Sequence, residues 1–382
     1  MAPQPTTNGG ATLNLQPNVI SKFKPAKIFK AAVDQPPPPA AGSTAQKQPP
    51  NPKSITGLTF DDRGDTLVTA GEDETFRLYN CKTGKQVPSF LFTHKASAIL
   101  YASTKEDDTI RYHSLHDNKY LAYFRGHKDK VISLEMAPLD DGFMSGSLDK
   151  TVRVWDLRTP ICRGILSVPA PPIIAHDSSG CVFAVGVNFY AKILLYDKSN
   201  YDKAPFLTMN VEDSSLSQIS FPARPIHMTS LSFSSNGKYL LVGCSGNAHY
   251  IMDAFEGTLL AKLEGHVGLE RTSMNAQRNI ETSKGISGEE VCWTPDSKYV
   301  ISGSLDGRIL VWDIQNLGSR SDVERHGTFV KVPKLVVLDG HPGPSRCVRF
   351  NPRLAMMATA GHELAFWLPD PSGDGDDPTK KR

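Results

Sequence analysis

The chain has 382 residues, 39% hydrophobic and 21% charged, and its 42 Lys and Arg against 40 Asp and Glu give a formal net charge of +2. This near balance argues against a strong direct nucleic-acid binder, because such proteins concentrate positive charge on one face. The six cysteines form no C-x-x-C pair, and no apolar run approaches the roughly 18 residues of a membrane span, so we expect a reducing compartment and no membrane association.

In chain order, the sequence first predicts a disordered arm over residues 1–20, which are polar and contain Gly and Pro. A β-compatible segment follows at 21–33. A proline-rich linker or insert comes next at 34–53, where the prolines lack the N–H that a central strand needs. Residues 54–369 hold short segments of alternating apolar and polar residues, typical of β-strands, between turn signals such as DDRG and LDDG. Residues 370–382 are expected to form a disordered tail.

An internal repeat organises the long central region. The segment SGSLDKTVRVWD (145–156) is identical to SGSLDGRILVWD (302–313) at eight of twelve positions. Weaker copies are anchored at Tyr79, His113, Trp155, Tyr196, Met252, Trp312 and Trp367. A period near 40–45 residues with Gly-His and Trp-Asp marks is typical of WD-repeat propellers. We therefore predict an all-β, seven-bladed WD40 β-propeller, closed by residues 21–33 as the outer strand of the blade that ends at Trp367.

Ser145, His127 and Asp149 lie close together in the chain, with Trp155 just beyond, and two interpretations are open. A hydrolase would use one such set, on a strained turn beside an oxyanion hole. In a WD repeat the same residue types hydrogen-bond in series and tie neighbouring strands together. Because the set recurs along the chain, we favour the structural interpretation. We predict no enzyme activity, no catalytic residue, no metal site and no cofactor.

Two further copies of this set support the structural interpretation. The second copy consists of His266, Ser302, Asp306 and Trp312. The third consists of His341, Thr359 and Trp367. In the third copy Gly361 replaces the Asp, so we expect an incomplete hydrogen-bond network there.

Four stretches carry more information than the repeat itself. They are DDTIRYHSLHDNKYLAYFRGH (107–127), SGSLDKTVRVWDLRTPICRGIL (145–166), FAVGVNFYAKILLYD (183–197) and FNPRLAMMATAGHELAFWLP (350–369). Together they resemble the small WD-repeat subunit of the COMPASS histone methyltransferase complex, which in fungi also serves the cleavage-and-polyadenylation factor. The likeness runs from about Phe23 to Pro369 and departs from the family pattern at 34–53 and 266–288.

The resemblance implies a non-catalytic scaffold in the nucleus. Its partners would be a SET-domain methyltransferase acting on a histone H3 lysine and other COMPASS subunits. The family also implies a direct or indirect link to RNA polymerase II with a phosphorylated C-terminal domain. It further implies contact with subunits of cleavage/polyadenylation and phosphatase complexes that act in transcription termination and RNA 3′-end processing.

Six basic residues beside the Gly-His turns, in the hairpin turn or in the 107–127 stretch are the candidate partner contacts. They are Arg111, His113, Lys128, Lys130, Lys150 and Arg346. A second hypothesis rests on Arg158, because the W-D-x-R sequence resembles the motif by which some propellers dock on cullin ubiquitin-ligase adaptors as substrate receptors. The sequence leaves open which complex dominates, which peptide or modified residue is bound, what the 34–53 and 266–288 segments do, and whether RNA or histone is contacted directly.

Overall fold

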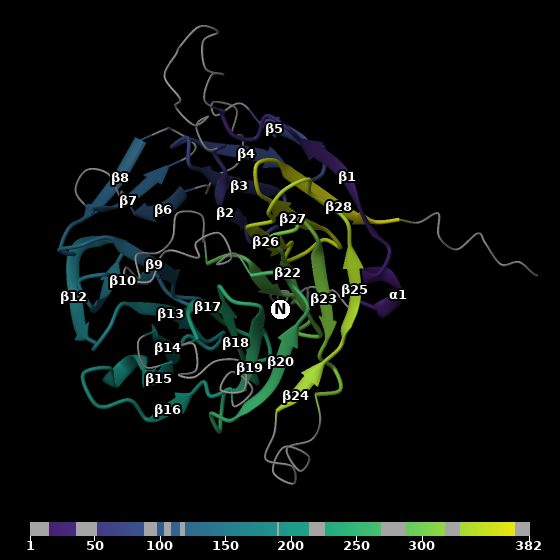
Figure 1. The fold of residues 1–382 in the computed structure, drawn as a ribbon. Helices are drawn as coiled ribbons and strands as arrows, with labels where there is room; N and C mark the ends of the chain where they lie inside the picture. The colour runs from purple at the N-terminus through teal and green to yellow at the C-terminus, as the bar shows by residue number, and fades with distance from the viewer. Residues whose placement is uncertain are drawn as a thin grey trace, which may run out of the picture.

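The computed structural model describes residues 15–35, 52–87, 98–102, 108–114, 119–188, 191–213, 226–268, 288–317 and 329–370. Within these ranges the chain is almost entirely β-structure, apart from helix α1 (Pro17–Ile20) and the 3-10 helix η2 (Lys198–Asn200). The strands form small sheets that follow one another around a common centre (Figure 1). The fold is therefore an all-β propeller of the WD40 type.

Six sheets have four or five strands and form complete blades. The first contains β2 (Ile55–Phe60), β3 (Thr66–Gly71), β4 (Phe76–Asn80) and β5 (Lys85–Val87). Another contains β9 (Val131–Met136), β10 (Gly142–Ser147), β11 (Thr151–Asp156) and β12 (Thr159–Ser167). The next contains β13 (Pro172–His176), β14 (Val182–Val187), β15 (Lys192–Asp197) and β16 (Leu207–Asn210). In all three, sequential strands pair antiparallel through short connections.

The other three blades draw on segments that are further apart in the chain. One contains β17 (Met228–Phe233), β18 (Tyr239–Cys244), β19 (Ala248–Asp253) and β20 (Leu259–Glu264), with β24 (Val330–Val332) added parallel to β20. The next contains β21 (Val291–Trp293), β22 (Tyr299–Gly303), β23 (Ile309–Asp313) and β25 (Lys334–Leu338). The last contains β26 (Cys347–Phe350), β27 (Met357–Ala360), β28 (Leu364–Pro369) and β1 (Phe23–Phe29).

The prediction of seven full blades is corrected by the structure, which gives six full blades and one smaller sheet. That sheet contains only β6 (Ala98–Ala102), β7 (Ile110–Ser114) and β8 (Lys119–Phe124). It lies in the ring between the β2–β5 and β9–β12 blades (Figure 1). Within the described residues this sheet has three strands, and residues 88–97, which precede β6 and would hold the predicted fourth strand, lie outside the described part of the chain.

Strand β1 completes the last blade from the other end of the sequence. It pairs antiparallel with β28, with Phe23 opposite Pro369 and Phe29 opposite Leu364. This is the closing position that the sequence analysis expects of residues 21–33. Its exposed residues include Lys24 and Lys27, and Pro25 next to an irregularity in the register. Charged side chains and proline suit an edge strand, because they discourage further strand pairing.

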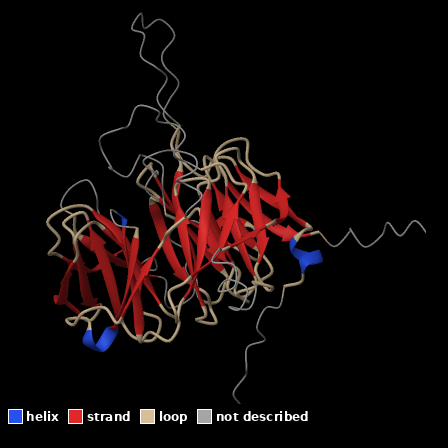
Figure 2. Cartoon of the chain, turned by 60° about the horizontal axis from the view of Figure 1, so that its bottom comes forward, coloured by secondary structure: helices blue, strands red, loops and turns tan. Residues whose placement is uncertain are grey.

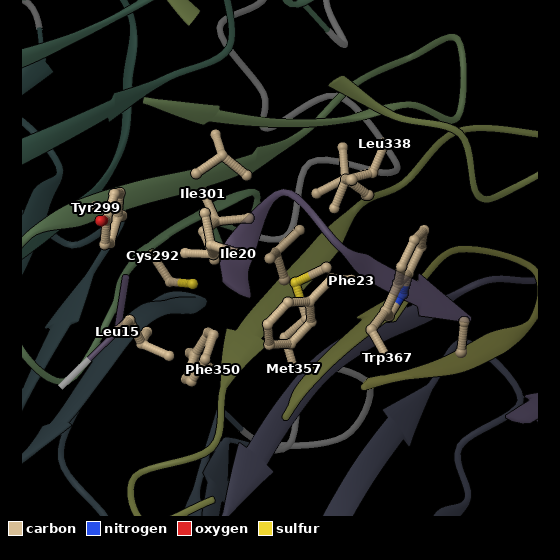
Figure 3. Close-up of a cluster of buried hydrophobic side chains, with 14 residues drawn as sticks. Leu15, Ile20, Phe23, Cys292, Tyr299, Ile301, Leu338, Phe350, Met357 and Trp367 are labelled. Atoms are coloured by element: carbon tan, nitrogen blue, oxygen red, sulfur yellow. The ribbon is translucent and has the colours of Figure 1, made fainter. Parts of the chain in front are cut away.

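The predicted disordered arm is wrong for its last residues. Residues 17–20 form α1, and the Leu15 and Ile20 side chains are almost completely buried. Figure 3 shows both in the buried cluster that fills the core between the last two blades, with Leu15 beside Phe350. The Leu15 backbone N–H also donates to the Asp296 carboxylate at 2.9 Å. Burial of apolar side chains, each contributing about 1.5–3 kcal/mol, holds this segment on the ring.

The cores lie between neighbouring sheets rather than within them. For example, Ile110 and Phe124 of the small sheet pack with Phe143 and Trp155 of the β9–β12 blade. Similar buried clusters fill the following four junctions and the junction between the last blade and the β2–β5 blade. Among the described side chains, no such cluster joins the β2–β5 blade to the small sheet.

The turns define two faces of the ring, and Figure 2 shows loops on both sides of the strands. We call the end of each blade with the turn between its second and third strands the upper face. The other end, with the first-to-second and third-to-fourth connections, is the lower face. Lower-face turns of neighbouring blades meet: the Asn236 backbone N–H donates to Ser297 Oγ at 3.3 Å, and Asn351 Nδ2 donates to the Gly64 carbonyl at 2.8 Å. The blades therefore share one orientation.

Candidate functional site on the upper face

A continuous hydrogen-bond chain runs through the upper half of the β9–β12 blade. Trp155 Nε1 donates to Ser145 Oγ at 2.8 Å, and Ser145 Oγ lies 2.7 Å from His127 Nε2. The other ring nitrogen, His127 Nδ1, lies 3.0 Å from Asp149 Oδ2. These partners fix the directions: Trp155 donates to Ser145, Ser145 donates to His127, and the Nδ1–H of His127 donates to the carboxylate. The four residues predicted from the sequence are thus brought together.

Burial and hydrogen bonding set the charges in this chain. Burial lowers the pKa of His127 despite the nearby Asp149 carboxylate, so the imidazole is neutral at physiological pH. Burial acts to raise the pKa of Asp149, but donation by Thr151, the Lys128 backbone N–H and His127 overcomes this and holds it at about 2. The carboxylate is therefore ionised and nearly saturated with donors.

The access to Ser145 decides what this arrangement can do. The Ser145 side chain has no exposed surface, and Trp155 beside it is 1% exposed. A nucleophile must reach its substrate, whereas a buried hydroxyl with two partners ties strands together. The geometry suits a structural link between β10, β11 and the turn that precedes β9.

The second predicted copy has different hydrogen-bond partners, which corrects the role expected for His266. Ser302 Oγ lies 2.9 Å from Nε2 of His249, not of His266. His266 instead contacts the Gly246 carbonyl through Nε2 at 3.0 Å. Trp312 donates to the Glu264 carbonyl at 3.3 Å.

Asp306 also departs from its predicted role, because its carboxylate binds Arg308 at 2.7 Å through Nε. The hydrogen-bond partners differ because of His249, a residue of the preceding blade. Counted from the repeat anchors, the position of His249 corresponds to Ile110 in the small sheet, which is apolar and fully buried. The larger polar ring of His249 reaches Ser302 and excludes His266.

The third copy keeps its hydrogen bonds but lacks the acid, as predicted. Trp367 Nε1 donates to Thr359 Oγ1 at 2.7 Å, and Thr359 Oγ1 lies 2.6 Å from His341 Nε2. Gly361 occupies the position of the missing Asp. Burial lowers the pKa of His341 to about 4, so this ring is neutral as well.

Three of the predicted partner-binding residues surround the upper turn of the β9–β12 blade. Lys128, Lys130 and Lys150 are all exposed. Their backbones belong to the same turn network: the Lys128 N–H donates to Asp149, and the Lys150 N–H donates to the Ser147 carbonyl. Lys150 has a φ of +62°, the left-handed conformation that the turn requires. The network thus presents three ammonium groups from a rigid base.

The other predicted contacts lie elsewhere. Arg158 follows β11 at the lower end of the same blade, where both Nε and Nη2 donate to Asp156. Those bonds and the charge of Arg158 lower the pKa of Asp156 to about 2. The Arg346 backbone N–H donates to the Ala360 carbonyl just before β26. The structure therefore separates Arg158 and Arg346 from the three lysines.

Arg111 and His113 lie on β7, beside aromatic residues that the sequence reasoning missed. The His113 and Tyr120 rings are 5.0 Å apart, and Tyr120 is 5.2 Å from Tyr123. The Arg111 guanidinium lies 5.9 Å from the Tyr120 centroid, a cation–π distance. The recurrence of Tyr within KYLAYF (119–124) on an outer strand was the available signal.

The part of the chain that the structure describes has no group of three or more His, Cys, Asp or Glu side chains that could hold a metal ion. No helix in that part is long and apolar enough to cross a membrane.

Comparisons with known proteins agree with the architecture. The WD40 family model (WD domain, G-beta repeat) matches residues 45–80, 118–156 and 286–313. WD repeat-containing protein 82 of Drosophila melanogaster is 37% identical over 94% of this chain and 98% of its own length. COMPASS component SWD2 of Saccharomyces cerevisiae is 33% identical over 93% and 98%, respectively. Set1 complex component swd2 of Schizosaccharomyces pombe is 31% identical over 82% and 92%.

Proposed function

Because the chain belongs to the WD40-repeat family that includes WD repeat-containing protein 82 and the Swd2 components, we propose that it is a non-catalytic scaffold subunit of a COMPASS-type histone H3 lysine methyltransferase complex in the nucleus. The observation that carries the proposal is the near full-length identity of 33% to a protein named as a COMPASS component. The S. pombe relative, named as a Set1 complex component, supports it independently.

The arrangement of the ring suits a scaffold. A propeller offers rigid faces on which several partners bind at once. The buried hydrogen-bond chains hold the upper turns in place, so the exposed lysines are presented without a large ordering cost on binding. We propose that Lys128, Lys130 and Lys150 contact an acidic segment of a partner subunit, and that Arg111, His113 and Arg346 contribute at separate points. We also propose that the propeller spans residues 54–369, with the sheet β6–β8 as its smaller unit.

A second part of the proposal concerns partners outside the methyltransferase complex. In keeping with the family likeness, the same subunit would link the methyltransferase to transcribing RNA polymerase II with a phosphorylated C-terminal domain. It would also serve a cleavage/polyadenylation and phosphatase complex in transcription termination and RNA 3′-end processing. The two roles compete for one chain, so the relative recovery of the two sets of partners measures which dominates.

The test is affinity purification of the tagged full chain from nuclei, read by quantitative mass spectrometry. Recovery of a SET-domain methyltransferase with other COMPASS subunits supports the main proposal, and recovery of polyadenylation-factor and phosphatase subunits supports the second role. A cullin with its adaptor, lost in Arg158→Ala and found without either assembly, would overturn both in favour of a ubiquitin-ligase receptor.

A further inference from the structure

The most exposed large apolar side chains of the described residues gather on one face of three neighbouring blades. They are Leu139 at 77%, Phe255 at 75%, Ile161 at 69% and Phe206 at 59% exposure. We call these four residues the lower rim, because each lies at or beside a lower-face connection. Leu139 is in the β9–β10 turn, Ile161 is the third residue of β12, Phe206 precedes β16 and Phe255 is in the β19–β20 turn.

Contacts between the blades place the lower-face connections that carry these residues side by side. Lys198 Nζ, which follows β15, lies 2.5 Å from the Asp140 carboxylate next to Leu139. The β19–β20 turn lies close against β16: a Cβ at Gly257 would stand 2.9 Å from the Met209 side chain and 3.4 Å from Leu207. The connections of the three blades are therefore in contact from Leu139 to Phe255.

Such a gathering is unusual for a surface that faces water only. Single exposed apolar residues are common in soluble proteins, but a contiguous set rimmed by polar groups marks a site of interaction. Leu139 and Phe255 lie in turns, which favour polar residues and glycine, so these two side chains do not stabilise the turns that carry them. Their presence therefore needs a reason outside the fold.

The charges beside the lower rim indicate the chemistry of its partner. Asp140 and Asp141 directly follow Leu139, and Glu256 directly follows Phe255. Side chains of the first two are 53% and 67% exposed. The lower-face connections and adjoining strand ends of the three blades carry eight acidic residues, Asp140, Asp141, Asp156, Asp177, Asp197, Asp202, Asp253 and Glu256, against five basic ones, Arg158, Arg163, Lys198, Lys203 and Lys238. Lys198 pairs with Asp140, and Arg158 pairs with both Asp141 and Asp156. The rim is thus apolar with an acidic border.

We propose that the lower rim binds a basic amphipathic helix of a partner protein, with leucine-type side chains over Leu139 and Phe255 and Lys or Arg against the neighbouring carboxylates. Apolar anchors supply most of the affinity in such contacts, and rim charges set orientation, association rate and salt dependence. This surface lies on the opposite face from Lys128, Lys130 and Lys150. It does not depend on the identity proposed above, and it gives the ring a second face of opposite charge character.

The test uses a synthetic 18-residue peptide with Leu at helical i, i+3, i+4 and i+7 spacing and Lys elsewhere, labelled for fluorescence anisotropy against the full chain. A matched peptide has Glu in place of Lys. We expect the Lys peptide to bind at least about tenfold more tightly than the Glu peptide, with affinity falling as salt rises. Equal binding of the two peptides would overturn the proposal.

Variants locate the binding. Leu139→Ser combined with Phe255→Ser should weaken the Lys peptide by about tenfold or more, since two anchors are lost. The matched control is Leu121→Ser combined with Leu368→Ser, which removes exposed leucines from β8 and β28 and should change binding less than about twofold. Asp141→Lys combined with Glu256→Lys should reverse the preference toward the Glu peptide.

Two outcomes would contradict this assignment. Equal loss in the control pair would mean general adsorption to exposed leucine. A dimer in sedimentation experiments that is abolished by the Leu139→Ser, Phe255→Ser pair would mean that a second copy of the chain covers the rim. Thermal unfolding of each variant, unchanged within the effect of ordinary surface substitutions, shows that binding and not folding has been altered.

Discussion

The imidazole rings of His249 and His266 stack face to face, with centroids 4.1 Å apart and planes 3° from parallel. Both rings are buried, at 1% and 6% exposure. His249 Nδ1 accepts the Cys244 backbone N–H at 3.0 Å, so its proton is on Nε2 and donates to Ser302. A second proton on this ring would break the bond to Cys244, and a charge on either ring would face its partner at close range. The stack therefore requires two neutral rings.

The first prediction is that acid destabilises the protein through this stack. Burial lowers the pKa of His266 from 6.5 to about 4, so the unfolded chain takes up the proton first as pH falls. The contribution is fully present above pH 6.5 and is lost toward pH 4. Between pH 7.5 and 5 it should cost about 2 kcal/mol from His266 alone.

His266→Phe isolates this effect, because the ring remains but cannot be protonated. Denaturant unfolding at pH 7.5 and pH 5 should show a pH dependence smaller by about the same amount in the variant. The lost bond to the Gly246 carbonyl lowers stability at both pH values and leaves the difference intact. Identical pH dependence in the two proteins would rule out the assignment.

The second prediction concerns the hydrogen-bond chain of the β9–β12 blade. Ser145→Ala leaves Trp155 Nε1 and His127 Nε2 without their shared partner in a buried site. The free energy of unfolding should fall by about 1–3 kcal/mol. Ser178→Ala, which removes an exposed hydroxyl on the lower face, is the control and should stay within about 0.5 kcal/mol. Equal stability of Ser145→Ala and the wild type would show that water replaces the hydroxyl.

The repeat pattern predicted some of these contacts correctly because they depend on fixed local spacing. Ser145, Asp149 and Trp155 belong to one hairpin, so the sequence distance between them carries their geometry. The hydrogen bond between Ser302 and His249 could not be predicted from local spacing, because His249 is 53 residues away and belongs to another blade. The position of His249 looks like any strand residue until its neighbour is known. Non-local packing, and not the repeat, decided which histidine reached the serine.

Composition misled the prediction for the N-terminal segment in a similar way. Residues 15–20 sit among polar residues and carry only a few apolar side chains, too few for a periodic signal. Their order comes from the core between the last two blades, which they enter from the far end of the chain (Figure 3). The exposure of Phe255 and Leu139 could not be predicted for a different reason, because the signals that mark a turn are polar residues and glycine and say nothing of its apolar side chains.

The third prediction follows from the buried N-terminal segment. Ile20→Ala removes a side chain that is 1% exposed and leaves a cavity in the cluster around Phe23 and Trp367. Thermal and denaturant unfolding should show a loss of about 2–4 kcal/mol. The control is Ile28→Ala on β1, which is 41% exposed and should lose much less. A disordered arm would give no effect for Ile20→Ala, and that result would contradict the observed packing.

The fourth prediction concerns a buried ion pair outside the repeat network. Lys262 Nζ lies 2.6 Å from Asp213 Oδ2, and the two side chains are 4% and 0% exposed. Tyr250 also donates to Asp213 at 2.9 Å. Burial acts to lower the pKa of Lys262, but the bonds to Asp213 and Glu264 raise it, so the lysine stays charged.

Asp213→Asn should therefore destabilise the protein by about 3 kcal/mol, because it leaves a buried cation with less compensation. Lys262→Met should do the same to the remaining carboxylate. The double variant should lose less free energy of unfolding than the two single variants lose together. A double-mutant cycle measures this coupling. Strict additivity would mean that the two groups do not interact in solution.

The last prediction concerns the upper face and rests on the proposed function. Lys130 is exposed, and its backbone carbonyl accepts the Leu148 N–H of the neighbouring turn, so a substitution of the side chain leaves the turn intact. Lys130→Glu should reduce recovery of COMPASS-type partners by about fivefold or more, because it reverses a charge at a contact held by attraction to an acidic segment. Lys85→Glu, on the outer strand β5 of another blade, is the control and should recover them normally. The unfolding temperature of both variants should match the wild type, since exposed substitutions of this kind change stability by less than about 0.5 kcal/mol. Full recovery with Lys130→Glu would remove this lysine from the interface, whereas loss in both variants would trace the effect to net charge and not to the upper face.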